Sequence, residues 1–170
     1  MGFGTAAGSF VSKRPPVGQR KFASPAVEEV IVRVKASIGD PELAWMFENC
    51  YPNTLDTTVE IGGDTKRPDT FIITGDIDAM WLRDSACQVW PYVPLAKTDR
   101  DLRRMFQGLI GRQARCILID PYANAFLPDP KSTNALEWAV GDLTEMRPGV
   151  AERKWEVDSL CYCIRLAHGY

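Results

Sequence analysis

Histidine is almost absent from this sequence, which contains only His168. A zinc site built from cysteine and histidine needs several such residues at close spacing, so composition gives little support for one. The sequence has five cysteines, which are Cys50, Cys87, Cys116, Cys161 and Cys163. Their odd number and scattered spacing, without a visible secretion signal, predict reduced and mostly buried thiols rather than a disulfide framework. We therefore expect no metal site.

An excess of one charge sign and a long apolar run are also lacking. Lys and Arg total 20 against 22 Asp and Glu, for a formal net charge of −2. This balance gives no footprint for nucleic acid and no polybasic patch for a membrane surface. No run approaches the roughly 18 apolar residues of a membrane span. The first residues lack the charged start and apolar core of a signal peptide, so the compartment is unknown and the cytoplasm is the default.

The apolar content, 45% of residues with 10% aromatic, is that of a globular chain with a buried core. Residues 1–24 are rich in Gly, Ala, Ser, Lys and Pro and predict a flexible arm, whose basic cluster at residues 13–21 we interpret as solvated. The remainder, residues 25–170, is then one domain or less. Ser24 and Asp40 are good N-caps and predict two helices, the first before Gly39 and the second after it.

Further along the chain, helical and β-type patterns alternate with turns. Two β-type runs, residues 57–61 and 70–74, predict a small hairpin. Helices are expected at about residues 81–89, at 99–120 and from about 157 onwards. Residues 121–151 contain several Pro, Gly and Asn and predict a long loop, with a short helical turn near residues 136–138. Periodicity alone predicts a mostly α chain.

The densest group of chemically informative residues lies within Thr70–Trp90. A β-type run turns at Gly75, Asp76 and Asp78 follow the turn, and Trp81, Arg83 and Asp84 stand at the head of a helix. Sugar hydroxyls need fixed donors and acceptors, and the C–H face of a sugar ring packs well on an aromatic surface. Arg83 presents a rigid fork of donors and Asp84 accepts, so the two side chains together fit adjacent hydroxyls.

Each of these residues also has a structural alternative. Arg83 and Asp84 can form an ion pair with other partners, and Trp81 can belong to the core. Asp76 and Asp78 can stabilise the turn or cap the helix that follows it. We favour a site role for at least one of these two aspartates.

The order of these residues resembles known glycosidases. Trp-Leu-Arg-Asp-Ser-Ala at residues 81–86 is similar to a segment of the glucoamylase-type (α/α)6 glycosidases, whose adjacent Arg and Asp bind the terminal sugar. The longer pattern resembles glycoside hydrolase family 125, the metal-independent exo-α-1,6-mannosidases, and especially its fungal branch of meiotically up-regulated proteins. The motifs that carry this resemblance are Phe47–Cys50, Pro52–Thr58, Arg67–Thr70, Ile73–Ile77, Met80–Ser85, Ile119–Phe126 and Trp155–Tyr162.

The resemblance implies part of an (α/α)6 toroid of the six-hairpin glycosidase type, with the small β-hairpin near the site. It implies removal of terminal α-1,6-linked mannose from a mannose-containing glycan, with inversion and without a metal or cofactor. Arg83, Asp84 and Trp81 would bind the terminal sugar. Asn124 and Asp158 lie in matching motifs and are further candidates, with turn formation for Asn124 and helix capping for Asp158 as alternatives.

The family's general acid and general base lie beyond its Val-Asp-Ser-Leu-Cys-Tyr motif, so we assign no catalytic residue. Twelve helices with their connections need about 200 residues, and the sequence has 170. We therefore expect an incomplete chain, the N-terminal portion of a glycosidase domain. The alternative is a truncated, non-catalytic carbohydrate-binding or scaffold protein of unknown oligomeric state.

Overall fold

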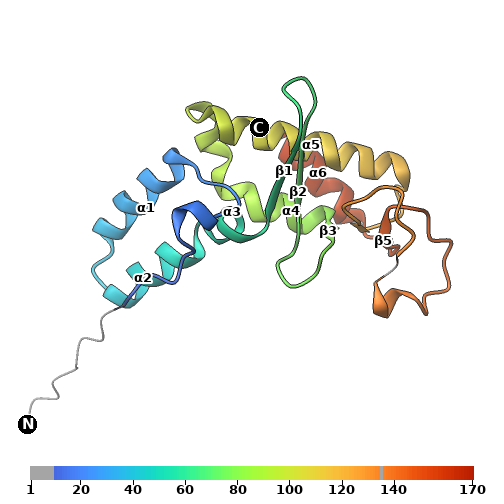
Figure 1. The fold of residues 1–170 in the computed structure, drawn as a ribbon, viewed down its shortest axis with the longest axis horizontal. Helices are drawn as coiled ribbons and strands as arrows, with labels where there is room; N and C mark the ends of the chain where they lie inside the picture. Colours follow the sequence, from blue (N-terminus) through green and yellow to red (C-terminus); the bar gives the residue numbers. More distant parts are fainter. Residues whose placement is uncertain (1–9, 135) are drawn as a thin grey trace, which may run out of the picture.

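The computed structural model describes residues 10–134 and 136–170. Helices dominate it, and two small antiparallel sheets lie among them (Figure 1). The helical elements in chain order are η1 (Val17–Gln19), α1 (Pro25–Ser37), α2 (Pro41–Cys50), α3 (Asn53–Thr57), α4 (Leu82–Val89), η2 (Trp90–Lys97), α5 (Arg100–Ile119), η3 (Glu137–Ala139) and α6 (Val157–Gly169). The strands are β1 (Val59–Gly63), β2 (Pro68–Ile72), β3 (Met80–Trp81), β4 (Ala125–Phe126) and β5 (Val150–Glu152).

The two predicted N-caps, Ser24 and Asp40, start helices as expected, and Asp99 is a third N-cap that was not predicted. The Ser24 hydroxyl accepts from the backbone N–H of Val27, and Asp40 accepts from the first-turn amides of α2. Asp99 does the same for α5 through the N–H of Leu102, at 2.9 Å. These bonds satisfy amide groups that have no partner inside the helix, which confirms where α1, α2 and α5 begin.

The predicted hairpin is also confirmed, because β1 and β2 pair antiparallel with Val59 opposite Ile72. The hairpin packs on α5 at Gly108, where an added Cβ would lie 2.4 Å from Thr70 Oγ1 and 2.8 Å from the carbonyl carbon of Asp69. Gly108 therefore costs α5 some helix propensity but permits the strand to approach the helix backbone closely.

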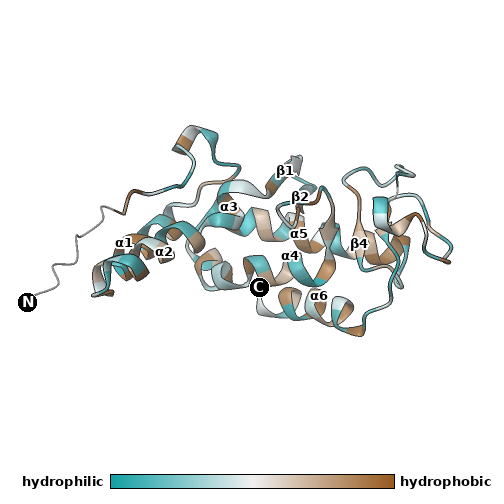
Figure 2. Ribbon diagram, turned by 90° about the horizontal axis from the view of Figure 1, so that it is seen from below, coloured by the Kyte–Doolittle hydropathy of each residue, from teal (hydrophilic) through white to brown (hydrophobic). Residues whose placement is uncertain are grey.

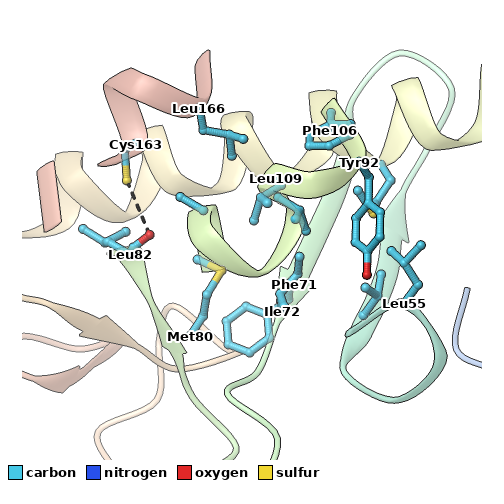
Figure 3. Close-up of a cluster of buried hydrophobic side chains, with 14 of the residues drawn as sticks. Leu55, Phe71, Ile72, Met80, Leu82, Tyr92, Phe106, Leu109, Cys163 and Leu166 are labelled. Atoms are coloured by element: carbon cyan, nitrogen blue, oxygen red, sulfur yellow. Dashed lines mark hydrogen bonds between the residues drawn. The ribbon is translucent and has the colours of Figure 1, made fainter. Parts of the chain in front are cut away.

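One apolar core lies between α4, α5, α6 and the hairpin. Figure 3 shows Met80 of β3 and Leu82 at the start of α4 converging with Leu109 of α5 and Leu166 of α6. All four of these side chains are buried, and the thiol of Cys163 donates toward the carbonyl of Leu82 in the same region. The core thus fixes the head of α4 relative to α6.

Two strands of a three-stranded sheet come from the region that the sequence predicted as a long loop. Strand β4 lies inside residues 121–151, and β5 begins at Val150 and ends one residue beyond them at Glu152. The two strands pair antiparallel with each other, and β4 also pairs with β3. The strands are only two or three residues long, so their sequence carries no strand signal and their pairing depends on distant segments. The short helical turn expected near residues 136–138 is confirmed as η3.

Part of the basic cluster was wrongly predicted to be solvated. Arg14 is 6% exposed and forms ion pairs with Glu28 at 2.5 Å and with Asp56 at 2.7 Å. Arg20 also pairs with Glu28, at 2.9 Å. Two acceptors on α1 and α3, which sequence spacing does not reveal, hold the described end of the arm against the domain. Residues 1–9 lie outside the described residues, and the boundary at residue 24 stays a prediction.

The five cysteines are free, as expected, but only Cys116 and Cys163 are buried. The prediction of mostly buried thiols is therefore wrong for Cys50, Cys87 and Cys161. Within residues 10–134 and 136–170, no helix has the length and apolar character needed to cross a membrane.

Candidate sugar-binding site

The site residues Trp81, Arg83 and Asp84 stand where β3 passes into α4. Trp81 is extended, with φ −77° and ψ 138°, and it is the residue before the first turn of the helix. The buried side chain of Leu82 anchors this junction in the core, and the Leu82 N–H donates to the carbonyl of Asn124 at 3.0 Å. The junction is thus fixed by packing on one side and by the neighbouring chain segment on the other.

Arg83 is held by carboxylates from two helices. Its Nη1 donates to Asp158 Oδ2 of α6 at 3.0 Å, and it lies 3.5 Å from Glu156 Oε2 just before that helix. Its Nη2 lies 3.5 Å from Asp84 Oδ2. The hydrogen bond between Arg83 and Asp158 is the main cause that raises the pKa of Arg83 and lowers the pKa of Asp158. The neighbouring opposite charges act in the same direction.

The Arg83–Asp84 pair remains accessible. Their side chains are 37% and 38% exposed, respectively. Asp84 Oδ2 is shielded from solvent and has no hydrogen-bond donor in the described part of the chain. The exposure of Asp84 therefore comes from the other atoms of its side chain. The pair therefore presents a fixed cation and a carboxylate side by side on an open surface.

Asn124 connects this surface to the β3–β4–β5 sheet. Its side chain is buried, donates to Glu152 Oε2 at 2.7 Å and accepts from the Lys154 N–H at 3.1 Å. Asn124 does more than the turn alternative required, because its amide binds the side chain of Glu152 and the backbone of Lys154. It supports the surface from below and is not itself exposed. A sugar contact by Asn124 stays a prediction.

The remaining predicted residues divide into two groups. Asp158 joins Arg83 directly, as described above. Asp76 and Asp78 lie in the bend between β2 and β3, with exposed side chains, and within the described residues no ion pair or hydrogen bond joins them to Arg83 or Trp81. A sugar contact by either aspartate stays a prediction.

Glu152 is the functional candidate that sequence reasoning missed. It lies at the end of β5, and the Trp81 indole N–H points to its Oε2 at 3.4 Å. Burial raises its pKa, but hydrogen bonds from Lys154, Asn124 and Trp138 outweigh that effect, so the pKa lies below its ordinary value. Its partners are up to 71 residues away, and the sequence gives no signal for that convergence.

The side chains of the described residues do not form a set of ligands suited to a metal ion. No group of three or more His, Cys, Asp or Glu side chains among residues 10–134 and 136–170 has a geometry that would hold one. The carboxylates near Arg83 face a guanidinium instead.

The fold is mostly helical, and an Arg-Asp pair, an aromatic side chain and surrounding carboxylates lie together at the head of one of its helices. The model of the family "Metal-independent alpha-mannosidase (GH125)" matches residues 40–170. The chain belongs to this family.

Two relatives are similar over most of the chain. The meiotically up-regulated gene 157 protein of Schizosaccharomyces pombe is 43% identical over 164 residues, which is 93% of this chain and 32% of that protein. A solved structure of a Streptococcus pneumoniae metal-independent α-mannosidase, a non-productive substrate complex with α-1,6-mannobiose, is 42% identical with a TM-score of 0.76. The match covers 88% of this chain and 34% of that one.

These similarities confirm two of the sequence-based expectations. The family and its fungal relatives were correctly predicted, and the fold is part of the (α/α)6 toroid of this family. The chain spans about a third of the length of the relatives it matches, 32% and 34% in the two cases.

Proposed function

We propose that this chain carries the residues with which an exo-acting α-1,6-mannosidase binds the terminal mannose of its substrate. Arg83, held by Asp158 beside Asp84, is the observation on which this rests. The guanidinium donates to one hydroxyl of the terminal mannose and the Asp84 carboxylate accepts from its neighbour, while the Trp81 indole supports the ring. The α-1,6-mannobiose bound by the Streptococcus pneumoniae relative supports this choice of sugar.

The reaction of the whole enzyme would be an inverting hydrolysis without a metal. One carboxylic acid protonates the leaving oxygen, and a carboxylate on the opposite face of the sugar removes a proton from the attacking water. In this geometry the two carboxyl groups stand about 6.5–9.5 Å apart. None of the candidate residues here is assigned to either role, and the pair is expected beyond Tyr170.

The first test is calorimetric binding of α-1,6-mannobiose to the chain, with an α-1,4-linked glucose disaccharide as the comparison sugar. We expect binding of the mannobiose alone, and Arg83→Ala should weaken it by about tenfold or more, because a hydrogen bond from a charged group is lost. Arg115→Ala is the matched control, since Arg115 is also an exposed, ion-paired arginine but pairs with Asp69. Binding of the glucose disaccharide alone would instead favour a glucoamylase-like specificity.

A second candidate function is a non-catalytic carbohydrate-binding or scaffold protein. It is favoured by exposed apolar side chains on two helices, such as Leu118 of α5, 84% exposed, and Ile164 of α6, 68% exposed. Figure 2 shows hydrophobic residues along the ribbons of both helices. Such side chains fit a helical surface covered by a partner. Release of mannose from α-1,6-mannobiose by the full-length protein, followed by NMR of the freed sugar, separates the two, because the catalytic pair is expected beyond Tyr170. Hydrolysis that yields the inverted β-anomer first supports the enzyme, and binding without hydrolysis by the full-length protein supports this alternative.

A further inference from the structure

The Glu152 carboxylate gathers four donors from four parts of the chain. Trp81 Nε1 of β3 lies 3.4 Å away, and Asn124 Nδ2 lies 2.7 Å away. Trp138 Nε1 of η3 lies 3.2 Å away, and Lys154 Nζ lies 2.8 Å away. One side chain therefore ties the site residue Trp81 to the region between β4 and α6.

The donors are divided evenly between the two oxygens. Oε2 accepts from Trp81 and Asn124, and Oε1 accepts from Trp138 and Lys154. An ionised carboxylate has about four acceptor positions and no donor, so this arrangement uses its full capacity. The side chain is 8% exposed, which gives the loss of any one of these bonds an energetic cost.

The charge of Glu152 is balanced locally. The Lys154 ammonium offsets the carboxylate, and the hydrogen bond to Glu152 raises the pKa of Lys154. A charged pair with every acceptor position filled is a rigid support, because moving one member leaves the others unsatisfied.

We propose that Glu152 is a positioning residue that fixes the indole of Trp81, two residues before Arg83 in the sequence, and thereby sets the affinity of the site for a terminal mannose. The choice of mannose as the ligand rests on the proposed function. The positioning of Trp81 rests on the hydrogen bonds of Glu152. Glu152 itself does not contact the sugar in this assignment. It acts on the orientation of the aromatic surface and on the loop that carries Trp138.

Glu152→Gln tests the requirement for a carboxylate with almost no change in shape. Whichever way the amide is turned, its NH₂ group faces two donors, either Trp81 and Asn124 or Trp138 and Lys154. The Lys154 ammonium is the strongest donor and keeps the amide oxygen, so the NH₂ group should face Trp81 and Asn124 and release the Trp81 indole. Asp56→Asn is the matched control, because Asp56 is also a buried carboxylate, 3% exposed, but its arginine partners belong to the N-terminal segment.

The first readout needs no ligand. The chain has five tryptophans, so ¹⁵N-labelled protein gives five indole N–H signals, and those of Trp81 and Trp138 are assigned with the two Trp→Phe variants. We expect Glu152→Gln to speed hydrogen exchange of the Trp81 indole by about tenfold, while Asp56→Asn changes neither indole. Faster exchange of Trp138 alone would contradict an action of Glu152 on Trp81. Equal exchange in the unmodified chain and in Glu152→Gln would overturn the positioning role.

The second readout is a double-mutant cycle on α-1,6-mannobiose affinity. Glu152→Gln should weaken binding by about fivefold or more in the unmodified chain and by less than about twofold in the Trp81→Phe chain, because the two residues act as a unit. Equal losses in both backgrounds would overturn an action through Trp81. If the indole signals change as expected but the unmodified chain binds no mannobiose, the proposed function fails, while the positioning of the Trp81 indole by Glu152 is still supported.

Discussion

The guanidinium of Arg83 donates to the carboxylate of Asp158 at 3.0 Å, across 75 residues of sequence. The contact joins the first turn of α4 to the first turn of α6. Asp158 is thus the partner that orients Arg83, and a sugar that binds Arg83 meets a side chain whose direction is already set. This preorganisation reduces the entropy that binding costs.

Asp158→Asn should weaken binding of α-1,6-mannobiose by less than Arg83→Ala does, because the guanidinium remains but loses its charged acceptor. The double variant should bind no more weakly than Arg83→Ala alone, as expected for one residue acting through the other. Isothermal titration calorimetry on the four proteins measures this. Additive losses would mean that Asp158 contacts the sugar by itself, and Glu60→Gln, on the exposed face of β1, is the control that should leave affinity unchanged.

Gly108→Ala should destabilise the protein even though alanine favours a helix. The added methyl group would overlap the backbone of β2, which lies within 2.9 Å of the Cβ position, so the strand must move away from α5. We expect a loss of about 2 kcal/mol in the free energy of unfolding, measured by urea denaturation.

Gly111→Ala, one turn further along α5, is the matched control. Its Cβ would meet only the flexible end of Arg115, at 3.4 Å. The substitution should stabilise the protein by up to about 1 kcal/mol through helix propensity. Similar effects of the two substitutions would show that the close approach at Gly108 does not limit stability.

The N-terminal segment should depend on Arg14 for its attachment. Arg14→Ala leaves the buried Asp56 carboxylate without its closest partner, and breaking a buried ion pair costs about 3 kcal/mol. We expect that loss in urea denaturation, together with faster proteolysis of residues 10–24. Lys35→Ala breaks the more exposed pair with Glu48 and should cost less than about 1 kcal/mol; an equal cost for both would contradict the anchoring role.

Acid should weaken the protein partly through Asp120, whose side chain is fully buried. Burial raises its pKa, but hydrogen bonds from Arg153 and from the Tyr122 N–H, together with nearby charges, outweigh that effect and lower it. A lowered folded-state pKa gives stability that is complete above the unfolded value near about 4 and is lost as pH falls through the folded value.

Asp120→Asn should therefore cost about 2 kcal/mol in the free energy of unfolding at pH 7, and this deficit should shrink as pH falls below about 4. Urea denaturation of both proteins across pH 3–7 gives the comparison. A deficit that stays constant over this range would show that the charge of Asp120 does not contribute. Glu60→Gln, at an exposed position, should show no deficit at either end.

Local chemistry made much of the fold predictable. Ser24, Asp40 and Asp99 cap helices because each side chain reaches amides only two or three residues away. The β1–β2 hairpin follows from two β-type runs separated by a short turn. The order of the motifs along the chain indicated the family without any knowledge of contacts.

The sequence by itself thus determined the helix starts, the hairpin, the family and the Arg83–Asp84 pair, since all of these are written in neighbouring residues. Only the tertiary structure decided which side chains support that pair. Asp158 reaches Arg83 from α6, and Glu152 reaches Trp81 and Asn124 from a three-residue strand at the end of a predicted loop. Such contacts join segments far apart in the chain, and they form because the core between α4, α5 and α6 fixes where those segments meet.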